Sequence, residues 1–226
     1  MKRVKVSNNV IRRLPRYLRK LDELDAAGIT RISSGELGRQ LGLTPSQIRQ
    51  DFSCFGEFGQ QGYGYKVSAL RNEIASILGM DRGFSAVLIG VGNIGQALMC
   101  NFDFSQWGFE LKAAFDVKPE LIGTEFQGVP IHDIADLEAF IRESSVDIAV
   151  LCVPKQIAVE ITERLVSCGV KGIWNFTNVE LISPNSNTNT MVENVHFSDS
   201  LLSLSYFVAE DIDEKAARAA RLSKQY

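Results

Sequence analysis

The residues best suited to chemistry in this chain form a glycine-rich run, GVGNIG, at positions 90–95. A short apolar segment of β type, 84–89, precedes the run, and a helical pattern follows it. In that setting Gly90 permits a tight turn, Gly92 lets backbone N–H groups approach a phosphate, and Gly95 lets the helix pack close to the strand. Because a helix N-terminus attracts anions, the run predicts a site for the pyrophosphate of a dinucleotide.

A carboxylate stands where such a site needs one. Asp116 ends a second predicted strand, 111–116, and lies 21 positions after Gly95. At that offset a carboxylate is expected to accept hydrogen bonds from the adenosine ribose hydroxyls, and it would repel a 2′-phosphate. The sequence therefore favours NAD(H) over NADP(H), although the nearby Lys118 works slightly against that preference.

Strand and helix patterns continue to alternate after Asp116, which is typical of a doubly wound parallel sheet of the Rossmann type. Pro154 follows one of these strands directly and marks a strand end at the expected cofactor crevice. We assign residues 81–198 to this domain. The predicted strands and helices are 129–131, 136–144, 147–153, 155–168 and 170–176.

The last segment, 199–226, is predicted to contain one long helix, because it lacks glycine as far as Leu222. Its apolar side chains are too numerous for a solvated tail, so we expect them to be buried against a second subunit. The sequence thus predicts a homodimer held by this helix. The apolar residues are Leu201, Leu202, Leu204, Tyr206, Phe207 and Val208.

Charge is unevenly distributed along the chain. The formal net charge is −3, but residues 1–80 hold 13 Lys and Arg against 7 Asp and Glu, whereas 81–226 hold 11 against 20. A basic first third joined to an acidic remainder indicates a polyanionic partner for the first third alone.

Two helices are predicted first within this basic part. The apolar spacing over 10–24 is that of an amphipathic helix, and Pro15 should kink that helix or make it restart. A second, shorter helix over 34–41 begins at a serine cap, Ser33 or Ser34.

A third helix, 45–55, carries side chains able to read a polyanion. Thr44 at the cap, Pro45 at the first helical position and Gln47 three residues after the cap form a capping box. Two short helices joined by a turn at Gly42, with polar side chains leading the second, form a helix-turn-helix. In such a motif amide and guanidinium groups reach base edges in the major groove of DNA.

A segment of glycines and aromatics, FGQQGYGY at 58–65, follows this third helix. Glycine adopts positive φ without strain, so the segment predicts a tight β-hairpin. Directly after a recognition helix, a hairpin is the wing of a winged helix, placed to touch the DNA backbone or minor groove. A further helix over 68–78 and Gly79 complete this domain, to which we assign residues 1–80.

With both halves considered, the chain resembles the Rex family of redox-sensing transcriptional repressors over nearly its whole length. The order of the two domains adds to the specificity of the shared stretches. These are IRRLPRY at 11–17, SGEL at 34–37, QIRQDF at 47–52, FGEFG at 55–59, GYGY at 62–65, GVGNIG at 90–95, FDV at 115–117, NF at 175–176 and VENV at 192–195.

The resemblance implies a homodimer whose C-terminal helices exchange between subunits. It also implies repression of fermentative or respiratory genes at palindromic operators in double-stranded DNA. High NADH would close the Rossmann domains and separate or reorient the recognition helices, whereas NAD+ competes for the same site but permits DNA binding.

Motifs and resemblance together assign two sets of contact residues and no catalytic or metal site. Phe197 is expected to reach toward the nicotinamide of the partner subunit. The cofactor set is Gly90, Val91, Gly92, Asn93, Ile94, Gly95, Phe102, Asp116, Val117, Lys118, Val153, Pro154, Phe176, Thr177 and Phe197. The DNA set is Arg12, Arg16, Pro45, Ser46, Gln47, Arg49, Gln50, Gln60, Gln61, Gly62, Tyr63 and Lys66.

Five positions depart from the commoner family pattern. Gln50, Gln60 and Gln61 stand where Lys or Arg is frequent, which should weaken phosphate contacts and change operator preference. Phe102 and His196 stand where tyrosine and aspartate are often found near the nicotinamide. Both changes remove groups that help to distinguish oxidised from reduced cofactor.

Two other functions remain open from the sequence. An NAD-dependent dehydrogenase needs a general acid or base in the crevice, and only His132 and His196 are available as histidines. A regulator of the same build that responds to another nucleotide, such as a coenzyme A species, is the second alternative.

The remaining composition places the protein in the cytoplasm. No apolar run approaches the roughly 18 residues of a membrane span, and no apolar signal core follows the basic N-terminus. Four separated cysteines, with no CxxC pair, are expected to be reduced thiols, with redox sensing by Cys54 or Cys100 as the alternative. The other two are Cys152 and Cys168.

Overall fold

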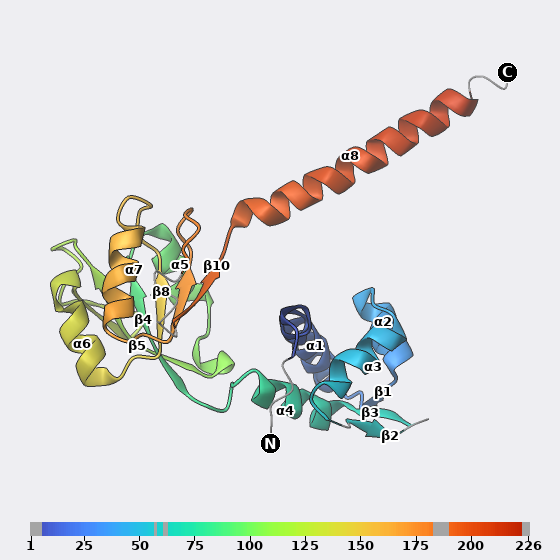
Figure 1. The fold of residues 1–226 in the computed structure, drawn as a ribbon, viewed down its shortest axis with the longest axis horizontal. Coiled ribbons are helices and arrows are strands. Elements are labelled where there is room, and N and C mark those ends of the chain that lie inside the picture. The colour runs from blue at the N-terminus through green and yellow to red at the C-terminus, as the bar shows by residue number, and fades with distance from the viewer. Residues whose placement is uncertain (1–5, 57, 61–62, 183–189, 223–226) are drawn as a thin grey trace. The chain divides into compact units, whose positions relative to one another are not determined.

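The computed structural model describes residues 6–56, 58–60, 63–182 and 190–222. The chain forms two compact units, an N-terminal unit, Met1–Gly83, and a C-terminal unit, Phe84–Tyr226 (Figure 1).

The N-terminal unit is a winged helix, as the sequence predicts. Its small antiparallel sheet has the order β1-β3-β2, and β2 and β3 are the expected hairpin. The elements are α1 (Asn8–Ala26), β1 (Arg31–Ile32), α2 (Ser34–Leu41), α3 (Pro45–Ser53), β2 (Gly59–Gln60), β3 (Gly64–Lys66) and α4 (Val67–Ile77).

Strand β1 was not predicted, because two residues carry no strand pattern. It forms because the hairpin strand β3 offers it a pairing edge, where Ile32 lies opposite Tyr65 and is buried. Gly64 makes the approach possible, since a Cβ at that position would lie 2.6 Å from the carbonyl oxygen of Ile32.

Of the kink or restart expected at Pro15, the restart is wrong, because α1 runs unbroken past this residue. Proline removes one backbone hydrogen bond, at a typical cost of about 3 kcal/mol. Side chains on one stripe of the helix are buried in the core, and burying each contributes roughly 1.5–3 kcal/mol, so packing outweighs the lost bond. The buried side chains are Val10, Leu14, Tyr17, Leu18 and Leu21.

Helices α2 and α3 begin at the caps that the sequence predicts. Ser33 Oγ accepts from the Glu36 N–H at 3.0 Å, and Thr44 Oγ1 accepts from the Gln47 N–H at 3.2 Å. The capping box is only half formed, because the Gln47 side chain donates to Asp51 at 2.8 Å instead of returning to the cap. Helix α3 also ends at Ser53, two residues earlier than expected.

Asp51 on α3 is completely buried and joins α3 to α1. Its carboxylate accepts from Arg13 Nε at 2.6 Å and Nη2 at 2.8 Å, and from the Tyr17 hydroxyl at 2.6 Å. Burial opposes ionisation of this carboxyl, but the hydrogen bonds from Arg13, Tyr17 and Gln47 outweigh it and hold its pKa below the ordinary value. The same burial, with the bond to Asp51, raises the pKa of Tyr17.

The C-terminal unit is built on a seven-stranded sheet of order β10-β9-β8-β4-β5-β7-β6. All neighbouring strands are parallel except β6 and β7. The elements are β4 (Phe84–Ile89), α5 (Asn93–Asn101), η1 (Ser105–Trp107), β5 (Phe109–Asp116), β6 (Glu125–Phe126), β7 (Val129–Asp133), η2 (Ile134–Asp136), α6 (Leu137–Ser144), β8 (Ile148–Leu151), α7 (Ala158–Ser167), β9 (Gly172–Asn175), β10 (Met191–Asn194) and α8 (Phe197–Leu222).

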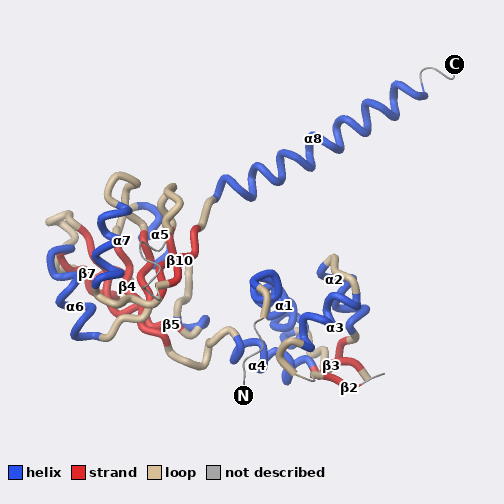
Figure 2. The backbone as a smooth tube through the Cα atoms, viewed as in Figure 1, coloured by secondary structure: helices blue, strands red, loops and turns tan. Residues whose placement is uncertain are grey.

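Helices cover both faces of this sheet, as a doubly wound fold requires (Figure 2). Ile89 and its neighbours on one face pack against α6 and α7, for example against Ile141 and Leu165. Leu88 and its neighbours on the other face pack against Met99 of α5 and against Phe104. Strands β6 and β10 were not predicted, because each is short and lies at an edge of the sheet.

Helix α8 follows β10 and leaves its apolar side chains exposed. Leu201, Leu204 and Val208 have 66%, 58% and 49% of their surface exposed. In the part of the chain that the structure describes, no helix combines the length and the apolar character needed to cross a membrane.

The buried carboxylate of Asp51 generates a prediction about stability. Asp51→Asn keeps the size but turns an amide N–H₂ toward donors, so unfolding at pH 7 should become easier by about 2–4 kcal/mol. Because the folded pKa lies below the ordinary 3.8, this stabilisation is complete above that value and is lost as pH falls through the folded pKa.

Urea unfolding followed by circular dichroism at pH 7 and near pH 3 measures the effect. Asp22→Asn is the control, because Asp22 pairs with Arg71 at 2.8 Å in a half-exposed setting and should cost under about 1 kcal/mol. Equal losses from the two substitutions, or a deficit for Asp51→Asn that does not shrink in acid, contradict the assignment.

Candidate functional site

Parallel strands of the C-terminal unit end together at one edge of the sheet. The register aligns residues near these ends in a single row, so the loops that follow emerge side by side. Strand β4 lies between β5 and β8, so the order of the strands reverses at β4. The carboxyl end of β4 is therefore the switch point at which open α/β sheets bind ligands. The aligned residues are Phe115, Ile89, Leu151, Asn175 and Asn194.

The glycine run lies at this switch point and has the predicted geometry. Gly90 has φ +94°, and a Cβ there would lie 2.6 Å from the carbonyl oxygen of Cys152. A Cβ on Gly95 would collide with the carbonyl oxygen of Gly90. A Cβ on Gly92 would meet nothing within 4 Å, so the space beside this N-cap residue of α5 is open. The loop therefore fits a pyrophosphate at its N–H groups.

Asp116 has a second role that sequence reasoning missed. The residue is only 8% exposed, and its carboxylate Oδ2 accepts from the Val91 N–H at 2.7 Å. Oδ1 accepts from the N–H groups of Val117 at 2.8 Å and Lys118 at 3.0 Å. Asp116 thus fastens the glycine-rich loop to the end of β5, and about one of its four acceptor positions is left for a ribose hydroxyl.

The other predicted cofactor residues differ in exposure. Val91, Phe176 and Thr177 are buried, and Val153 is half-buried. The exposed members are Asn93, Ile94, Val117, Lys118, Pro154 and Phe197.

Phe102 lies at the end of α5, away from the glycine run. Its ring is 5.3 Å from that of Trp174, which is 4.6 Å from Phe176, which in turn is 6.2 Å from Phe197. Phe102 also lines a cavity of about 470 Å³ near the start of β5. The aromatic series therefore links the end of α5 to the strand-end edge.

Cys152 follows β8 at the same edge. Burial raises the pKa of its thiol to about 12.

The beginning of α3 in the N-terminal unit is exposed, as a recognition helix requires. Pro45, Ser46 and Gln50 are exposed. Arg49 donates to Ser46 Oγ at 3.2 Å and to Ser34 Oγ at 3.0 Å on α2. Gln47 differs, because it is half-buried and its amide donates to Asp51.

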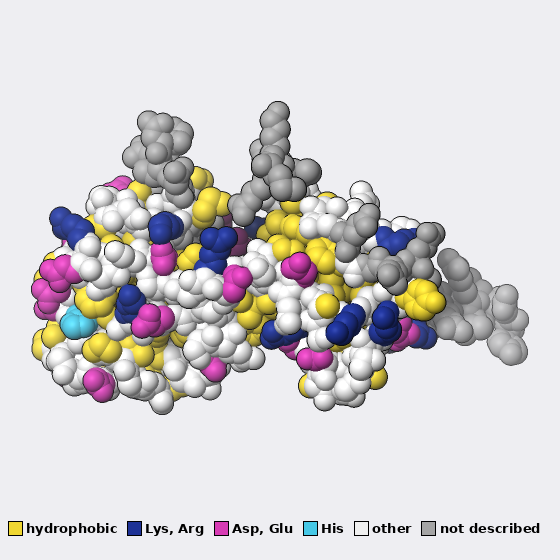
Figure 3. All heavy atoms as spheres, turned by 90° about the horizontal axis from the view of Figure 1, so that it is seen from below, with side chains coloured by type: hydrophobic (Ala, Val, Ile, Leu, Met, Phe, Trp, Pro, Cys, Tyr) yellow, Lys and Arg dark blue, Asp and Glu magenta, His cyan; other side chains and the backbone are white. Residues whose placement is uncertain are grey.

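The wing and α1 provide the other predicted DNA contacts. Tyr63 is 71% exposed, and its carbonyl accepts from Arg31 at 3.3 Å. Arg12, Arg16 and Lys66 are exposed, and Arg16 donates to the carbonyl of Leu41 at 3.0 Å. On the face seen in Figure 3, basic side chains of this unit lie beside apolar ones. Gln61, Gly62 and the side chain of Gln60 lie outside the described residues.

A winged helix and a Rossmann unit with a dinucleotide-type glycine loop, on one chain, define a class: a DNA-binding regulator that responds to a nucleotide.

Comparisons with known proteins agree with this class. Residues 81–179 match the family model of the CoA binding domain, and residues 5–53 match that of the putative DNA-binding protein N-terminus. The redox-sensing transcriptional repressor Rex of Clostridium acetobutylicum is 46% identical over 209 residues, covering 92% of this chain and 96% of that protein. Rex of Thermoanaerobacter pseudethanolicus is 47% identical over 210 residues, covering 93% and 92%.

Solved structures of a Rex-family repressor, RSP, are also similar. RSP itself matches with a TM-score of 0.86 at 43% identity, covering 95% of this chain and 99% of that chain. RSP in complex with β-NAD+ and operator DNA matches with a TM-score of 0.85 at 45% identity, covering 96% and 98%.

The chain therefore belongs to the Rex family of redox-sensing transcriptional repressors. It is a regulator of transcription, and the alternative of an NAD-dependent dehydrogenase is set aside because the relatives are named repressors.

The contrast between Gly92 and Gly95 generates a prediction. Gly92→Ala places a methyl group in open space, so stability should change by less than about 1 kcal/mol, while dinucleotide affinity falls at least tenfold because the methyl group occupies the phosphate approach. Gly95→Ala forces backbone apart and should destabilise the fold by about 2 kcal/mol or more.

Thermal unfolding and calorimetric titration with NADH distinguish the two variants. Wild-type NADH affinity in a well-folded Gly92→Ala protein would rule out the phosphate position assigned here.

Proposed function

We propose that this chain is a cytoplasmic repressor that binds palindromic operator DNA as a homodimer and leaves it when NADH occupies the crevice. The observation that carries the proposal is the open glycine-rich loop fastened by Asp116, on the same chain as a recognition helix. RSP supports it, because that relative is known in complex with β-NAD+ and operator DNA and in complex with β-NADH.

On DNA, the exposed side chains at the start of α3 would contact base edges, while the wing and α1 would contact the backbone. Arg49 offers a guanidinium for a guanine edge, although it must exchange its bonds to Ser34 and Ser46. Asp51 contributes indirectly, because it fixes α3 on α1 and so presents the reading side chains on a rigid base.

In the crevice, the N–H groups at the start of α5 would hold the pyrophosphate, and Asp116 would accept from the adenosine ribose. The dinucleotide supplies a nicotinamide ring that is cationic in NAD+ and neutral in NADH. Phe176 would lie near that ring, and Phe197 would reach toward the ring bound by the partner subunit. Phe102 and His196 take the places where tyrosine and aspartate are common in the family, so this chain would discriminate between the two forms by different contacts.

The homodimer rests on α8. An apolar stripe of this size is costly in water, and a second copy of the same helix region covers it symmetrically. Two recognition helices related by a twofold axis would then match the two halves of a palindrome.

A coenzyme A species remains the second candidate effector, because residues 81–179 match the CoA binding domain model. Calorimetric titration with NADH, NAD+, NADPH and acyl-CoA separates the two. Selective submicromolar binding of acyl-CoA would replace NADH in the proposal.

A mobility shift with a labelled palindromic operator tests the main proposal. NADH should release the DNA at concentrations where NAD+ leaves it bound. Affinity should fall by roughly 10³-fold between 50 and 200 mM salt if about six phosphates are contacted.

Arg49→Ala should weaken operator binding about tenfold and leave NADH binding unchanged, and Asp116→Ala should do the reverse. If both substitutions impair both activities equally, the assignment of operator binding to one unit and NADH binding to the other is wrong.

Charge on the α8 stripe should prevent dimerisation. Leu204→Glu with Val208→Glu buries carboxylates in the expected interface, so light scattering at about 10 μM should show a monomer. Asp213→Asn, half a turn away from Leu204 around the helix axis, is the control and should remain dimeric. A dimer of unchanged mass for the double variant excludes α8 as the interface.

A further inference from the structure

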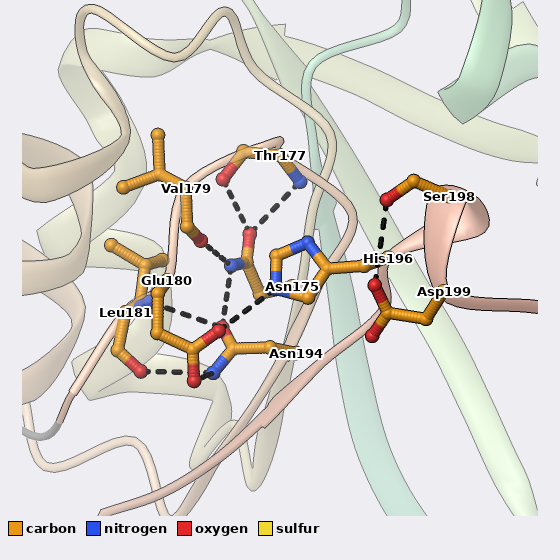
Figure 4. A network of polar contacts seen from close by, with 9 residues as sticks. All are labelled: Asn175, Thr177, Val179, Glu180, Leu181, Asn194, His196, Ser198 and Asp199. Carbon is orange, nitrogen blue, oxygen red and sulfur yellow. Dashed lines mark hydrogen bonds and ion pairs between the residues drawn. The ribbon is translucent and has the colours of Figure 1, made fainter. Parts of the chain in front are cut away.

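The loop that follows β9, residues 176–181, is held by a polar network that begins at Asn175 (Figure 4). Asn175 is completely buried at the end of β9. Its Oδ1 accepts from the N–H of Thr177 at 2.9 Å and from the Thr177 hydroxyl at 2.7 Å. Its Nδ2 donates to the carbonyl of Val179 at 2.8 Å and to Asn194 Oδ1 at 2.7 Å. Two donors and two acceptor positions of this amide are therefore used.

Asn194 repeats the arrangement from the neighbouring strand β10, where it lies opposite Asn175. Its Oδ1 also accepts from the N–H of Leu181 at 3.1 Å. Its Nδ2 donates to the carbonyl of Leu181 at 3.1 Å and to Glu180 Oε1 at 3.2 Å. The side chain of Asn194 thus joins the far end of the loop, as well as Asn175, to β10.

The same loop reaches the start of α8. Glu180 Oε2 lies 2.8 Å from His196 Nε2, one residue before α8 begins. The ring of Phe176 lies 6.2 Å from that of Phe197, the first residue of α8. At its other side the loop is anchored to β8, because the Phe176 N–H donates to the carbonyl of Leu151 at 2.9 Å.

This loop starts at the strand-end edge that the glycine run and Asp116 also border. If the loop shifted relative to β10, the side-chain amides of Asn175 and Asn194 would lose hydrogen bonds. Unpaired buried amide groups are costly. Those bonds are preserved only if the loop moves together with the ends of β9 and β10 and the first turn of α8, because Asn175 belongs to β9 and bonds to Asn194 on β10. The network therefore makes the loop, the ends of these two strands and the start of α8 one rigid unit.

From this juxtaposition we propose that Asn194 is a positioning residue, through which occupation of the dinucleotide crevice is passed to α8. The inference rests on the proposed function, because it concerns the response of operator binding to NADH. Asn194 acts through Asn175 and the 176–181 loop and need not touch the dinucleotide. The response is measured as the ratio of the operator dissociation constants with and without saturating NADH.

Asn194→Ala is the main test on the full-length protein. The operator dissociation constant without NADH and the NADH dissociation constant without DNA should each change by less than about threefold. The ratio of the operator dissociation constants with and without saturating NADH should fall at least about fivefold. Met191→Ala is the matched control, because Met191 is on the same strand, is 76% exposed and occupies the opposite face. It should keep the wild-type ratio.

A second pair of variants guards against simple misfolding. Asn194→Asp keeps the acceptor for Asn175 but sets a carboxylate against Glu180, so the ratio should fall as for Asn194→Ala. Adding Glu180→Gln lets the new amide at position 180 donate to the new carboxylate at position 194. The bond is then re-formed in the opposite direction, and the double variant should recover part of the ratio. Rescue of the ratio without a matching rise in melting temperature is not expected if Asn194 only stabilises the fold.

Different outcomes test the proposed function and the role of Asn194 separately. A wild-type protein whose operator affinity ignores NADH overturns the proposed function and this inference with it. A responsive wild type together with an unchanged ratio in Asn194→Ala overturns the inference alone. Parallel losses of melting temperature, operator affinity and NADH affinity at an unchanged ratio also overturn it, because they indicate a structural role.

Discussion

The bond between the Asp116 carboxylate and the Val91 N–H is the constraint on which the candidate nucleotide site depends. It ties the loop after β4 to the end of β5, so the first turn of α5 is aimed before any ligand arrives. The loop accepts that position only because Gly90 and Gly95 lack a Cβ. Because the loop is already ordered, ligand binding loses little free energy to ordering of the backbone.

Asp51 serves the N-terminal unit in a comparable manner. Its buried carboxylate, on the same helix as the exposed side chains expected to contact DNA, accepts from donors on two helices and fixes one against the other. In both units a buried acid orients the elements that carry the contacts, and Asp116 keeps one acceptor position for a ligand as well. The buried ion pair of Asp51 with Arg13 fixes the geometry of the two helices, and a buried ion pair is weak evidence for net stability.

Much of this arrangement was predictable from the sequence, because the signals are local. The glycine spacing, the Ser33 and Thr44 caps and the alternation of strands and helices each depend on residues close in the chain. What could not be predicted depends on distant partners. Strand β1 exists only because β3 pairs with it, the Gln47 amide turns to Asp51, and α1 passes Pro15 because its buried stripe holds it. Asn175 and Asn194 were also unpredictable as a pair, since only the register of β9 with β10 brings them together.

The thiol of Cys152 beside the glycine loop has one more consequence. Because burial raises the pKa of this thiol to about 12, it stays protonated at pH 7 and the nucleophilic thiolate is scarce. Peroxides and disulfides react with thiolates, so they find almost no target at this point of the crevice. A redox signal read at this point is therefore carried by the bound dinucleotide and not by oxidation of Cys152.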